Sequence, residues 1–257
     1  MNIKIAGIAV SLNIENRKLR TAAQKRYKYF FSGSGPALAI DVKDKAKNTR
    51  SPAMILLKGN KISIKHRSFV CDIDKKGKKG ILYSADNIYH LDSFLRMFYS
   101  VMLMEKNGLL LHSCAIAKGD KAAVFSGRSN SGKTTTARLF PRPRVLSDEV
   151  VALRKSGRTW YAYSTPFWGE MKPGGKSVRK KLKAVYFLKR GRGFRTAGLS
   201  RGESVKSLMR NMLFFVKKGA GGLCIDALSE LAADIPCRNF YFDIPHINRR
   251  CIDELIG

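Results

Sequence analysis

The stretch of sequence that decides the fold is Gly127-Arg128-Ser129-Asn130-Ser131-Gly132-Lys133-Thr134, which fits the spacing G-x-x-x-x-G-K-[ST]. An apolar run, residues 122–126, comes directly before it, and a short helical pattern, residues 133–140, follows until Pro141. In this spacing the glycines let backbone N–H groups wrap around phosphates, and the helix N-terminus adds partial positive charge. The sequence therefore predicts a phosphate-binding loop between a strand and a helix.

The polar side chains of this loop have predicted tasks. Lys133 is expected to reach the β- and γ-phosphates of a nucleotide, and the Thr134 hydroxyl to ligate Mg²⁺. We therefore predict ATP and Mg²⁺ as the ligands of this region. The predicted nucleotide contacts are the loop and the residue after it: Gly127, Arg128, Ser129, Asn130, Ser131, Gly132, Lys133, Thr134 and Thr135.

Outward from the loop, apolar runs and helical patterns alternate as in an α/β domain. Residues 109–117 form a nearly unbroken apolar run, which is typical of a covered strand in the middle of a sheet. Ser200 and Glu203 have the spacing of a capping box, which predicts a helix from there to about residue 217. The other predicted elements are strands at 145–147, 150–153, 159–163, 184–188 and 239–242 and helices at 223–233 and 247–255.

The N-terminal third of the chain has a different pattern. Apolar residues at helical spacing between Leu91 and Met102 predict one helix. Strands are predicted at 3–10, 37–42, 53–57, 61–65, 69–73 and 81–84. We therefore expect two parts, a β-rich N-terminal subdomain over residues 1–85 and a core with C-terminal helices over residues 86–257.

The charge of the chain is strongly basic and unevenly spread. The 257 residues include 49 Lys and Arg and 19 Asp and Glu, a formal net charge of +30, and 44% of them are hydrophobic. That apolar content is too high for a disordered basic tail and predicts a folded protein. Residues 121–202 contain twenty Lys and Arg but only three acids, Asp148, Glu149 and Glu170. Three carboxylates in such a cationic stretch suggest a divalent metal site or a proton acceptor.

Other features exclude several classes of protein. No apolar window approaches the roughly 18 residues of a membrane-spanning helix, and the N-terminus has the pattern of a strand rather than of a secretory signal. The five cysteines are widely spaced without a C-x-x-C pair, which favours reduced thiols that pack as small apolar side chains. We therefore expect a cytoplasmic protein without a membrane partner.

Two carboxylates directly follow a predicted strand downstream of the loop. Asp148 ends the apolar run of residues 145–147, and Glu149 comes next. A nucleotide site of this kind needs a carboxylate on a neighbouring strand to position Mg²⁺ or to activate the nucleophile. The pair is predicted to supply one metal ligand and one base, and the sequence leaves open which is which.

The four histidines have different settings. His112 interrupts an apolar strand, where a histidine bonded to backbone is the ordinary case and a catalytic role is the alternative. His66, His90 and His246 show no ligand spacing and are predicted to be surface or packing residues.

The order of these segments resembles that of the HPr kinase/phosphorylase-related kinases, whose nucleotide-binding core is shared with phosphoenolpyruvate carboxykinase. The matching segments are residues 108–113 (Gly-Leu-Leu-Leu-His-Ser), 123–127 leading into the loop, 145–149 (Val-Leu-Ser-Asp-Glu) and 165–170 (Thr-Pro-Phe-Trp-Gly-Glu). The resemblance implies an α/β fold with a P-loop core of this kind and a β-rich N-terminal part.

The resemblance also implies roles for single residues. His112 would line the active site, and the pair Asp148 and Glu149 would hold the base that takes the proton from a serine hydroxyl. The implied metal ligands are Thr134, Asp148 and Glu170. The implied catalytic residues are His112, Lys133, Asp148 and Glu149.

The chain departs from the family pattern at a few places. Glu149 stands where the HPr kinases have a second aspartate, and Asn130 and Ser131 stand where they usually have a glycine and a small residue. Their catalytic arginine has no clear counterpart, and the candidates are Arg179, Arg195 and Arg201. The phosphorylase reaction and HPr itself as substrate are therefore not assumed.

These observations predict a Mg²⁺-dependent phosphotransferase, an ATP-dependent kinase that moves the γ-phosphoryl group to a hydroxyl, by preference of serine, on a peptide or protein. The alternatives are a nucleic-acid-binding ATPase, a kinase of free serine or a nucleoside, and a protein that binds nucleotide without turnover. The charge favours nucleic acid, but no recognisable binding module supports it. An acidic acceptor fits the charge, and a homo-oligomer is left open. The basic residues 171–183 are predicted to form either a mobile cover for the site or a solvated turn.

Overall fold

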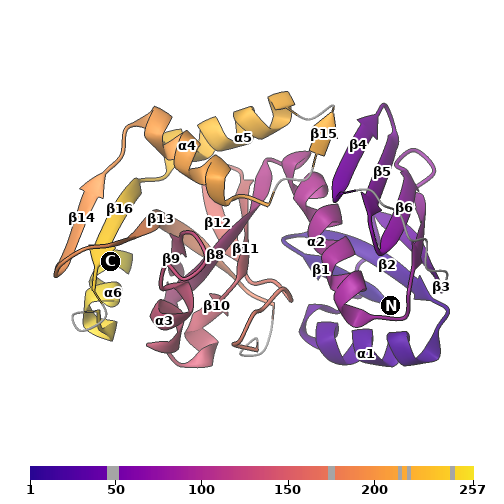
Figure 1. Cartoon of the computed structure of the whole chain (residues 1–257), viewed down its shortest axis with the longest axis horizontal. Coiled ribbons are helices and arrows are strands. Elements are labelled where there is room, and N and C mark those ends of the chain that lie inside the picture. Colours follow the sequence, from indigo (N-terminus) through magenta and orange to yellow (C-terminus); the bar gives the residue numbers. More distant parts are fainter. Residues whose placement is uncertain (45–51, 173–176, 214–215, 219–220, 244–246) are drawn as a thin grey trace. The chain divides into compact units, whose positions relative to one another are not determined.

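The computed structural model describes residues 1–44, 52–172, 177–213, 216–218, 221–243 and 247–257 (Figure 1). They form a mixed α/β structure with two mixed β-sheets, which confirms the predicted α/β class. The chain divides into two compact units, Met1–Leu103 with Phe214–Gly222 and Met104–Leu213 with Leu223–Gly257. The first unit contains both the predicted subdomain of residues 1–85 and the helix predicted near residues 91–102.

The described residues of the first unit form one sheet, two α-helices and a short 3₁₀ helix, Lys28–Phe30. Its strands are β1 (Asn2–Ile5), β2 (Ile8–Ile14), β3 (Leu38–Asp44), β4 (Met54–Lys58), β5 (Lys61–His66), β6 (Phe69–Asp74), β7 (Lys79–Ser84) and β15 (Val216–Lys218). Their spatial order is β1-β2-β3-β7-β6-β5-β4-β15, with parallel pairs at β2/β3, β3/β7 and β4/β15. The helices are α1 (Arg17–Tyr27) and α2 (Ile88–Met104).

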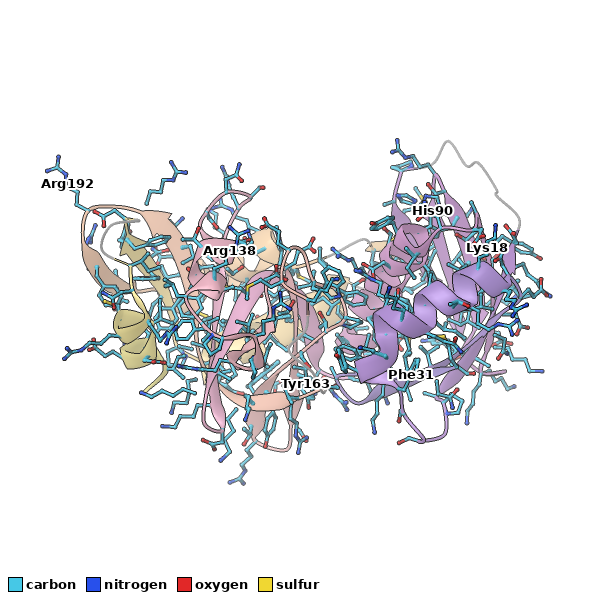
Figure 2. All side chains as sticks on the ribbon, turned by 90° about the horizontal axis from the view of Figure 1, so that it is seen from below. Lys18, Phe31, His90, Arg138, Tyr163 and Arg192 are labelled. Carbon is cyan, nitrogen blue, oxygen red and sulfur yellow. The ribbon has the colours of Figure 1, made fainter. Side chains whose placement is uncertain are left out.

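Two local features of this unit differ from the sequence prediction. The first predicted strand is two strands, β1 and β2, because Ala6 and Gly7 have φ of +48° and +82° and turn the chain. Helix α1 is absent from the prediction, since its buried residues recur only every fourth position, from Leu19 to Tyr27. Apart from Ala22, the rest of α1 is polar and mostly exposed, as at Lys18 (Figure 2), so its apolar stripe is too narrow to recognise by periodicity.

The second unit holds the other sheet, in which five strands pair in a closed circuit. Its strands are β8 (Gly108–Lys118), β9 (Lys121–Ser126), β10 (Val145–Ser147), β11 (Val150–Ser156), β12 (Thr159–Tyr163), β13 (Arg179–Arg190), β14 (Phe194–Gly198) and β16 (Cys237–Phe242). β8 pairs with β11, β11 with β12, β12 with β13, β13 with β9, and β9 again with β8. β9, β13 and β16 run parallel, so their C-terminal ends meet at one edge.

The helices of the second unit are α3 (Lys133–Arg138), α4 (Arg201–Asn211), α5 (Gly221–Asp234) and α6 (Arg249–Ile256). The capping box of Ser200 and Glu203 is present at the start of α4, as predicted. The helix ends at Asn211, earlier than predicted, because Met212 is extended and pairs with Leu111 of β8. Side chains of α3 and α6 form an apolar cluster with β8, β9, β13 and β16.

Two further boundaries correct the prediction. β14 is absent from it, although the strand pairs along its whole length with β16. β13 begins at Arg179, so the predicted basic loop of residues 171–183 is shorter than expected, and residues 173–176 of it lie outside the described chain.

None of the helices in the parts of the chain described above is long and apolar enough to cross a membrane. Cys71, Cys114, Cys224 and Cys237 are buried free thiols, as the sequence predicts. Burial raises the pKa of the Cys114 thiol to about 12, so it packs as an uncharged side chain. The cytoplasmic location stays a prediction.

Candidate functional site

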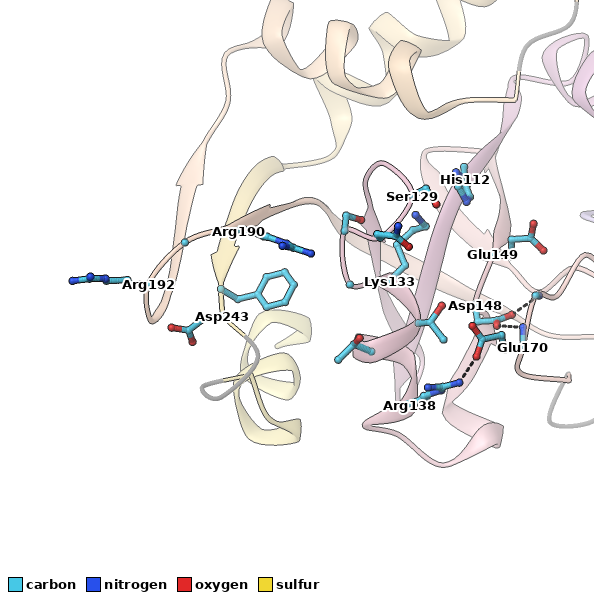
Figure 3. Close-up of a pocket in the computed structure, with 18 residues that line it drawn as sticks. His112, Ser129, Lys133, Arg138, Asp148, Glu149, Glu170, Arg190, Arg192 and Asp243 are labelled. Atoms are coloured by element: carbon cyan, nitrogen blue, oxygen red, sulfur yellow. Dashed lines mark hydrogen bonds and ion pairs between the residues drawn. The ribbon is translucent and has the colours of Figure 1, made fainter.

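A cavity of about 1030 Å³ lies at the edge of the second unit's sheet where β9, β13 and β16 end (Figure 3). Such a volume can hold a nucleotide-sized ligand. The cavity is lined by His112, Ser129, Asn130, Ser131, Gly132, Lys133, Thr134, Thr135, Arg138, Asp148, Glu149, Gly169, Glu170, Arg190, Gly191, Arg192, Phe242 and Asp243. Every predicted site residue except Gly127 and Arg128 is therefore on its wall.

The glycine-rich loop (residues 127–134) makes close backbone contacts that explain its glycines. Gly132 has a φ of +101°, and a Cβ there would lie 2.6 Å from Cζ of Phe242. A Cβ on Gly127 would lie 2.5 Å from Oγ of Ser131. Because neither position has room for a side chain, the glycines are required by the shape of the loop.

The side chain of Lys133, at the end of the loop, bonds to the backbone at the start of the loop. Its Nζ donates hydrogen bonds to the carbonyl oxygens of Gly127 and Arg128, at 2.8 and 2.9 Å. The side chain is buried, which lowers the pKa of Lys133, while the negative charge of Glu149 acts in the opposite direction. Two of the three ammonium protons are thus used within the loop, and the third is left for a ligand.

Ser131 supplies a further polar group to this wall. Its Oγ is buried and has no hydrogen-bond partner in the described chain. A buried hydroxyl without a partner is costly, and a phosphate oxygen of a ligand would satisfy it. The loop therefore fits a phosphorylated ligand on an observation independent of its sequence pattern.

Asp148 lies at the junction between β10 and β11 and is buried. Its carboxylate accepts hydrogen bonds from the backbone N–H groups of Gly169, Glu170 and Met171, at 2.9, 2.8 and 2.8 Å. These bonds connect segments about twenty residues apart and fix the turn that carries Glu170. Asp148 therefore fixes the turn at residues 169–171 and also lines the cavity.

The side chain of Glu170 lies beside α3. It forms an ion pair with Arg138, and both side chains are largely exposed. Arg138 follows Thr134 by four residues on α3, so the two share one helix face. The turn held by Asp148 thus presents Glu170 beside Arg138, the last residue of α3 (Figure 3).

The polar groups near Thr134 suit Mg²⁺ only as part of a nucleotide complex. In the described part of the chain, no three or more His, Cys, Asp or Glu residues cluster to hold a metal by themselves. Magnesium in nucleotide sites takes one or two carboxylates, and phosphate and water oxygens complete its shell. The Thr134 hydroxyl and the Glu170 carboxylate fit that need, whereas the oxygens of Asp148 already accept three N–H groups.

Glu149 and His112 are placed by the pairing of β8 with β11. His112 pairs with Val150, and the N–H of Ser113 donates to the carbonyl oxygen of Glu149 at 2.9 Å. The hydroxyl of Ser126, at the end of β9, donates to the carbonyl oxygen of His112 at 2.9 Å. Three strands therefore fix these two residues on the cavity wall (Figure 3).

The arginines on the cavity wall are not the ones that the sequence analysis considered. Arg179 stacks on Tyr161 and Arg195 on Tyr241, with 4.6 and 4.0 Å from guanidinium carbon to ring centre. Arg201 donates to the carbonyl oxygen of Ser229. The cavity is instead lined by Arg138, Arg190 and Arg192. Arg190 ends β13 and Arg192 follows it, both after the strand predicted at 184–188, and only the register of β13 places Arg190 beside the loop.

The other histidines lie away from this cavity or outside the described residues. His66 stacks on Phe69, with ring centres 4.7 Å apart, and burial lowers the pKa of its imidazole. His90 lies at the start of α2 in the first unit. His246 lies outside the described residues.

No protein-family model matches the chain, and no curated protein matches its sequence. The resemblance in the order of motifs therefore stays a prediction, and any assignment of function depends on the geometry of the cavity.

Proposed function

We propose that the chain is a Mg²⁺-dependent, P-loop-containing kinase of the HPr kinase and phosphoenolpyruvate carboxykinase type, which transfers the γ-phosphoryl group of ATP to a serine hydroxyl of a peptide or protein. One observation carries the proposal. Asp148, Glu149 and Glu170, which are the only acids among residues 121–202, all line the cavity that the glycine-rich loop lines. A phosphotransferase needs this pairing of a phosphate site with carboxylates.

The phosphate side of the proposed site is the glycine-rich loop. Gly127 and Gly132 pack closely against the side chains of Ser131 and Phe242, which fixes the shape of its backbone. Lys133 has a proton left for a phosphate oxygen, and the buried Ser131 hydroxyl lacks another partner in the described chain. Thr134 and Glu170 would hold Mg²⁺, which when bound neutralises charge on the phosphates.

Glu149 is the proposed base. The oxygens of Asp148 accept three backbone N–H groups and hold the turn of Glu170, so this carboxylate has a positioning task. In the proposed reaction Glu149 takes the proton of the serine hydroxyl, and the serine oxygen forms a bond to the γ-phosphorus as the bond to the β-phosphate oxygen breaks. His112, on the same wall, would orient the acceptor.

The proposal is tested with γ-labelled ATP, Mg²⁺ and serine-containing peptides or proteins encoded nearby, followed by location of the labelled residue. We expect labelled serine with the wild-type chain and none with Lys133→Ala. Lys180→Ala is the matched control, since Lys180 lies at the start of β13 and its Nζ bonds to the carbonyl oxygen of Gly119. Transfer by Lys133→Ala at the wild-type rate would overturn the proposal.

A second pair of variants separates the two neighbouring carboxylates. Glu149→Gln should abolish transfer and leave ATP binding nearly unchanged, because only the proton acceptor is lost. Asp148→Asn should weaken both, because it loosens the turn that carries Glu170. If instead Asp148→Asn abolished only transfer and Glu149→Gln weakened both transfer and ATP binding, Asp148 would be the base and Glu149 the positioning residue.

The nucleic-acid-binding ATPase remains a second candidate because of one surface. Register places Arg154, Tyr161 and Lys181 directly opposite one another on β11, β12 and β13, and Tyr163 opposite Arg179. Alternating cations and aromatic rings on a sheet face suit single-stranded nucleic acid. Titration with a labelled oligonucleotide at about 150 mM salt decides the matter. Submicromolar binding with stimulated hydrolysis, both lost in Arg179→Ala, would favour this candidate over the kinase.

A further inference from the structure

Arg190 is the last residue of β13, and the register of that strand places it beside the glycine-rich loop. Phe187 pairs with Ser126, the last residue of β9, so Arg190 lies beyond the end of β9, where the loop begins. Alternate residues of a strand face the same side. Tyr186 and Leu188 belong to the apolar cluster that includes Ala137 of α3. Arg190 therefore continues that row on the side of the sheet where α3 lies.

The neighbouring strand confirms this placement of Arg190. Arg190 pairs with Phe242 of β16, whose ring tip fills the space next to Gly132. The end of the β13/β16 pair thus packs directly against the loop. Figure 3 shows the Arg190 side chain extending toward Lys133, whereas Arg192 points away.

The charge of Arg190 is not neutralised within the described parts of the protein. Arg190 is exposed and has no carboxylate partner there, in contrast to Arg138, which pairs with Glu170. Lys133 donates two of its protons to loop carbonyls. A further cation on this wall would stabilise a bound polyphosphate, and the Arg190 side chain extends toward Lys133 (Figure 3).

The carboxylates and Arg190 lie on different sides of the loop. Asp148, Glu149 and Glu170 are on one side of Lys133 and Arg190 is on the other (Figure 3). In phosphoryl transfer the attacking and leaving oxygens are roughly in line through the phosphorus. If the acceptor is activated at Glu149, the leaving oxygen is on the side of Arg190.

We propose that Arg190 is a catalytic residue that binds the β-phosphate of ATP and stabilises the negative charge that develops on the leaving ADP. In this step the serine oxygen bonds to the γ-phosphorus, and the proton goes to Glu149. The electron pair of the broken bond goes to the β-phosphate oxygen, where the guanidinium donates. The inference rests on the proposed function and adds the group that assists the leaving side.

The test compares Arg190→Ala and Arg190→Lys with Lys189→Ala. Lys189 is the matched control, because its loss removes the same charge from the adjacent position, which faces the other side of β13. Binding of ATP, ADP and AMP is measured by calorimetry. The rate of γ-phosphate release or transfer is measured in single turnover at saturating MgATP.

We expect Arg190→Ala to lower the single-turnover rate about 10²- to 10³-fold and to weaken ADP binding about tenfold. AMP binding should stay unchanged, because AMP has no β-phosphate. Arg190→Lys should keep part of the rate, added guanidinium should restore part of it to Arg190→Ala, and Lys189→Ala should match wild type.

Two results would overturn the inference alone: equal rates and ADP affinities for Arg190→Ala and Lys189→Ala, or equal weakening of AMP and ADP by Arg190→Ala. If wild type binds neither ATP nor ADP, the proposed function fails and the role of Arg190 fails with it. If the wild type binds ATP and transfers its γ-phosphate, the proposed function stands, and the Arg190 variants then test the role of Arg190 separately.

Discussion

Each unit has one buried aspartate among its described residues, and the two have opposite surroundings. Asp92 of α2 accepts hydrogen bonds from Nε and Nη2 of Arg26 at 2.8 and 2.9 Å and from the Tyr27 hydroxyl at 3.2 Å. Arg96 lies 3.3 Å from the same carboxylate. Asp148 instead accepts only uncharged backbone N–H groups in the bonds described above.

The difference shows what each carboxylate does. Asp92 is paired with guanidinium groups and connects α1 to α2, and it is not among the residues that line the cavity described above. Asp148 has backbone N–H partners in place of guanidinium groups, and it lies beside a cavity together with Glu149 and Glu170. Burial of a charged carboxylate costs several kcal/mol unless its partners compensate for the lost water. Guanidinium groups compensate by neutralising the charge, whereas backbone N–H groups compensate without adding a countercharge. The comparison therefore separates a structural ion pair from a group at a candidate site.

The largest effect on stability is expected at Asp92. Asp92→Asn leaves the guanidinium of Arg26, only 12% exposed, without its charge partner. We expect the free energy of unfolding in urea to fall by about 3–5 kcal/mol. Asp86→Asn is the control, because Asp86 is exposed in the segment before α2, and it should change stability by less than about 0.5 kcal/mol. A loss below about 1 kcal/mol for Asp92→Asn would contradict the structural role.

Asp148→Asn should have the second largest effect on stability, and unlike Asp92→Asn it should also lower turnover. An amide places an NH₂ donor against backbone N–H groups, so we expect a loss of about 1–3 kcal/mol in the free energy of unfolding. ATP turnover should fall about 100-fold, because the turn that carries Glu170 shifts. Asp92→Asn, measured on folded protein, should turn over ATP at the wild-type rate. Equal turnover by both variants would remove the distinction between the two aspartates.

Sequence patterns predict much of the loop side of the cavity because the relevant residues are neighbours in the chain. The spacing of residues 127–134 predicts the bend between β9 and α3, and the structure shows that bend. The isolation of Asp148, Glu149 and Glu170 among basic residues suggests a shared site, and the structure places all three on one cavity. The kinase chemistry itself stays a prediction.

The rest of the cavity depends on distant contacts that no local pattern encodes. Phe242 contacts Gly132 across more than a hundred residues, and Arg190 reaches the loop only through the register of β13. The three N–H donors of Asp148 come from a turn about twenty residues later. The closed circuit of strands likewise follows from β8 and β13 each pairing along different parts of their length, which periodicity does not reveal.

A third prediction compares two glycines with positive φ, one in each unit. Gly132 has a φ of +101° and contacts Phe242, whereas Gly7 has a φ of +82° in the turn between β1 and β2. Each Gly→Ala change should cost about 1–3 kcal/mol in the free energy of unfolding. Only Gly132→Ala should also weaken ATP binding, measured by calorimetry on folded protein. Equal weakening by Gly7→Ala would show that general destabilisation, not the loop, controls binding.

The smallest effect is expected at Asp253, a carboxylate that is more exposed than the two buried aspartates. Asp253 of α6 pairs with Arg144, and both side chains are about one quarter exposed, at 25% and 27%. The hydrogen bond from Arg144 lowers the pKa of the Asp253 carboxyl below its ordinary value. Its stabilising contribution is therefore complete above the unfolded value near pH ~3.9, and it is lost as the pH falls through the lower folded value.

Asp253→Asn removes this titration and retains a hydrogen-bond acceptor. The difference in unfolding free energy between wild type and Asp253→Asn should be constant above about pH 5, at a few tenths of a kcal/mol. It should shrink toward zero below about pH 3, when the wild-type carboxyl is protonated. Urea denaturation across this range measures the difference. Growth of the difference at low pH would reverse the sign of the linkage and show that Asp253, unlike Asp92, does not gain its stability from an arginine partner.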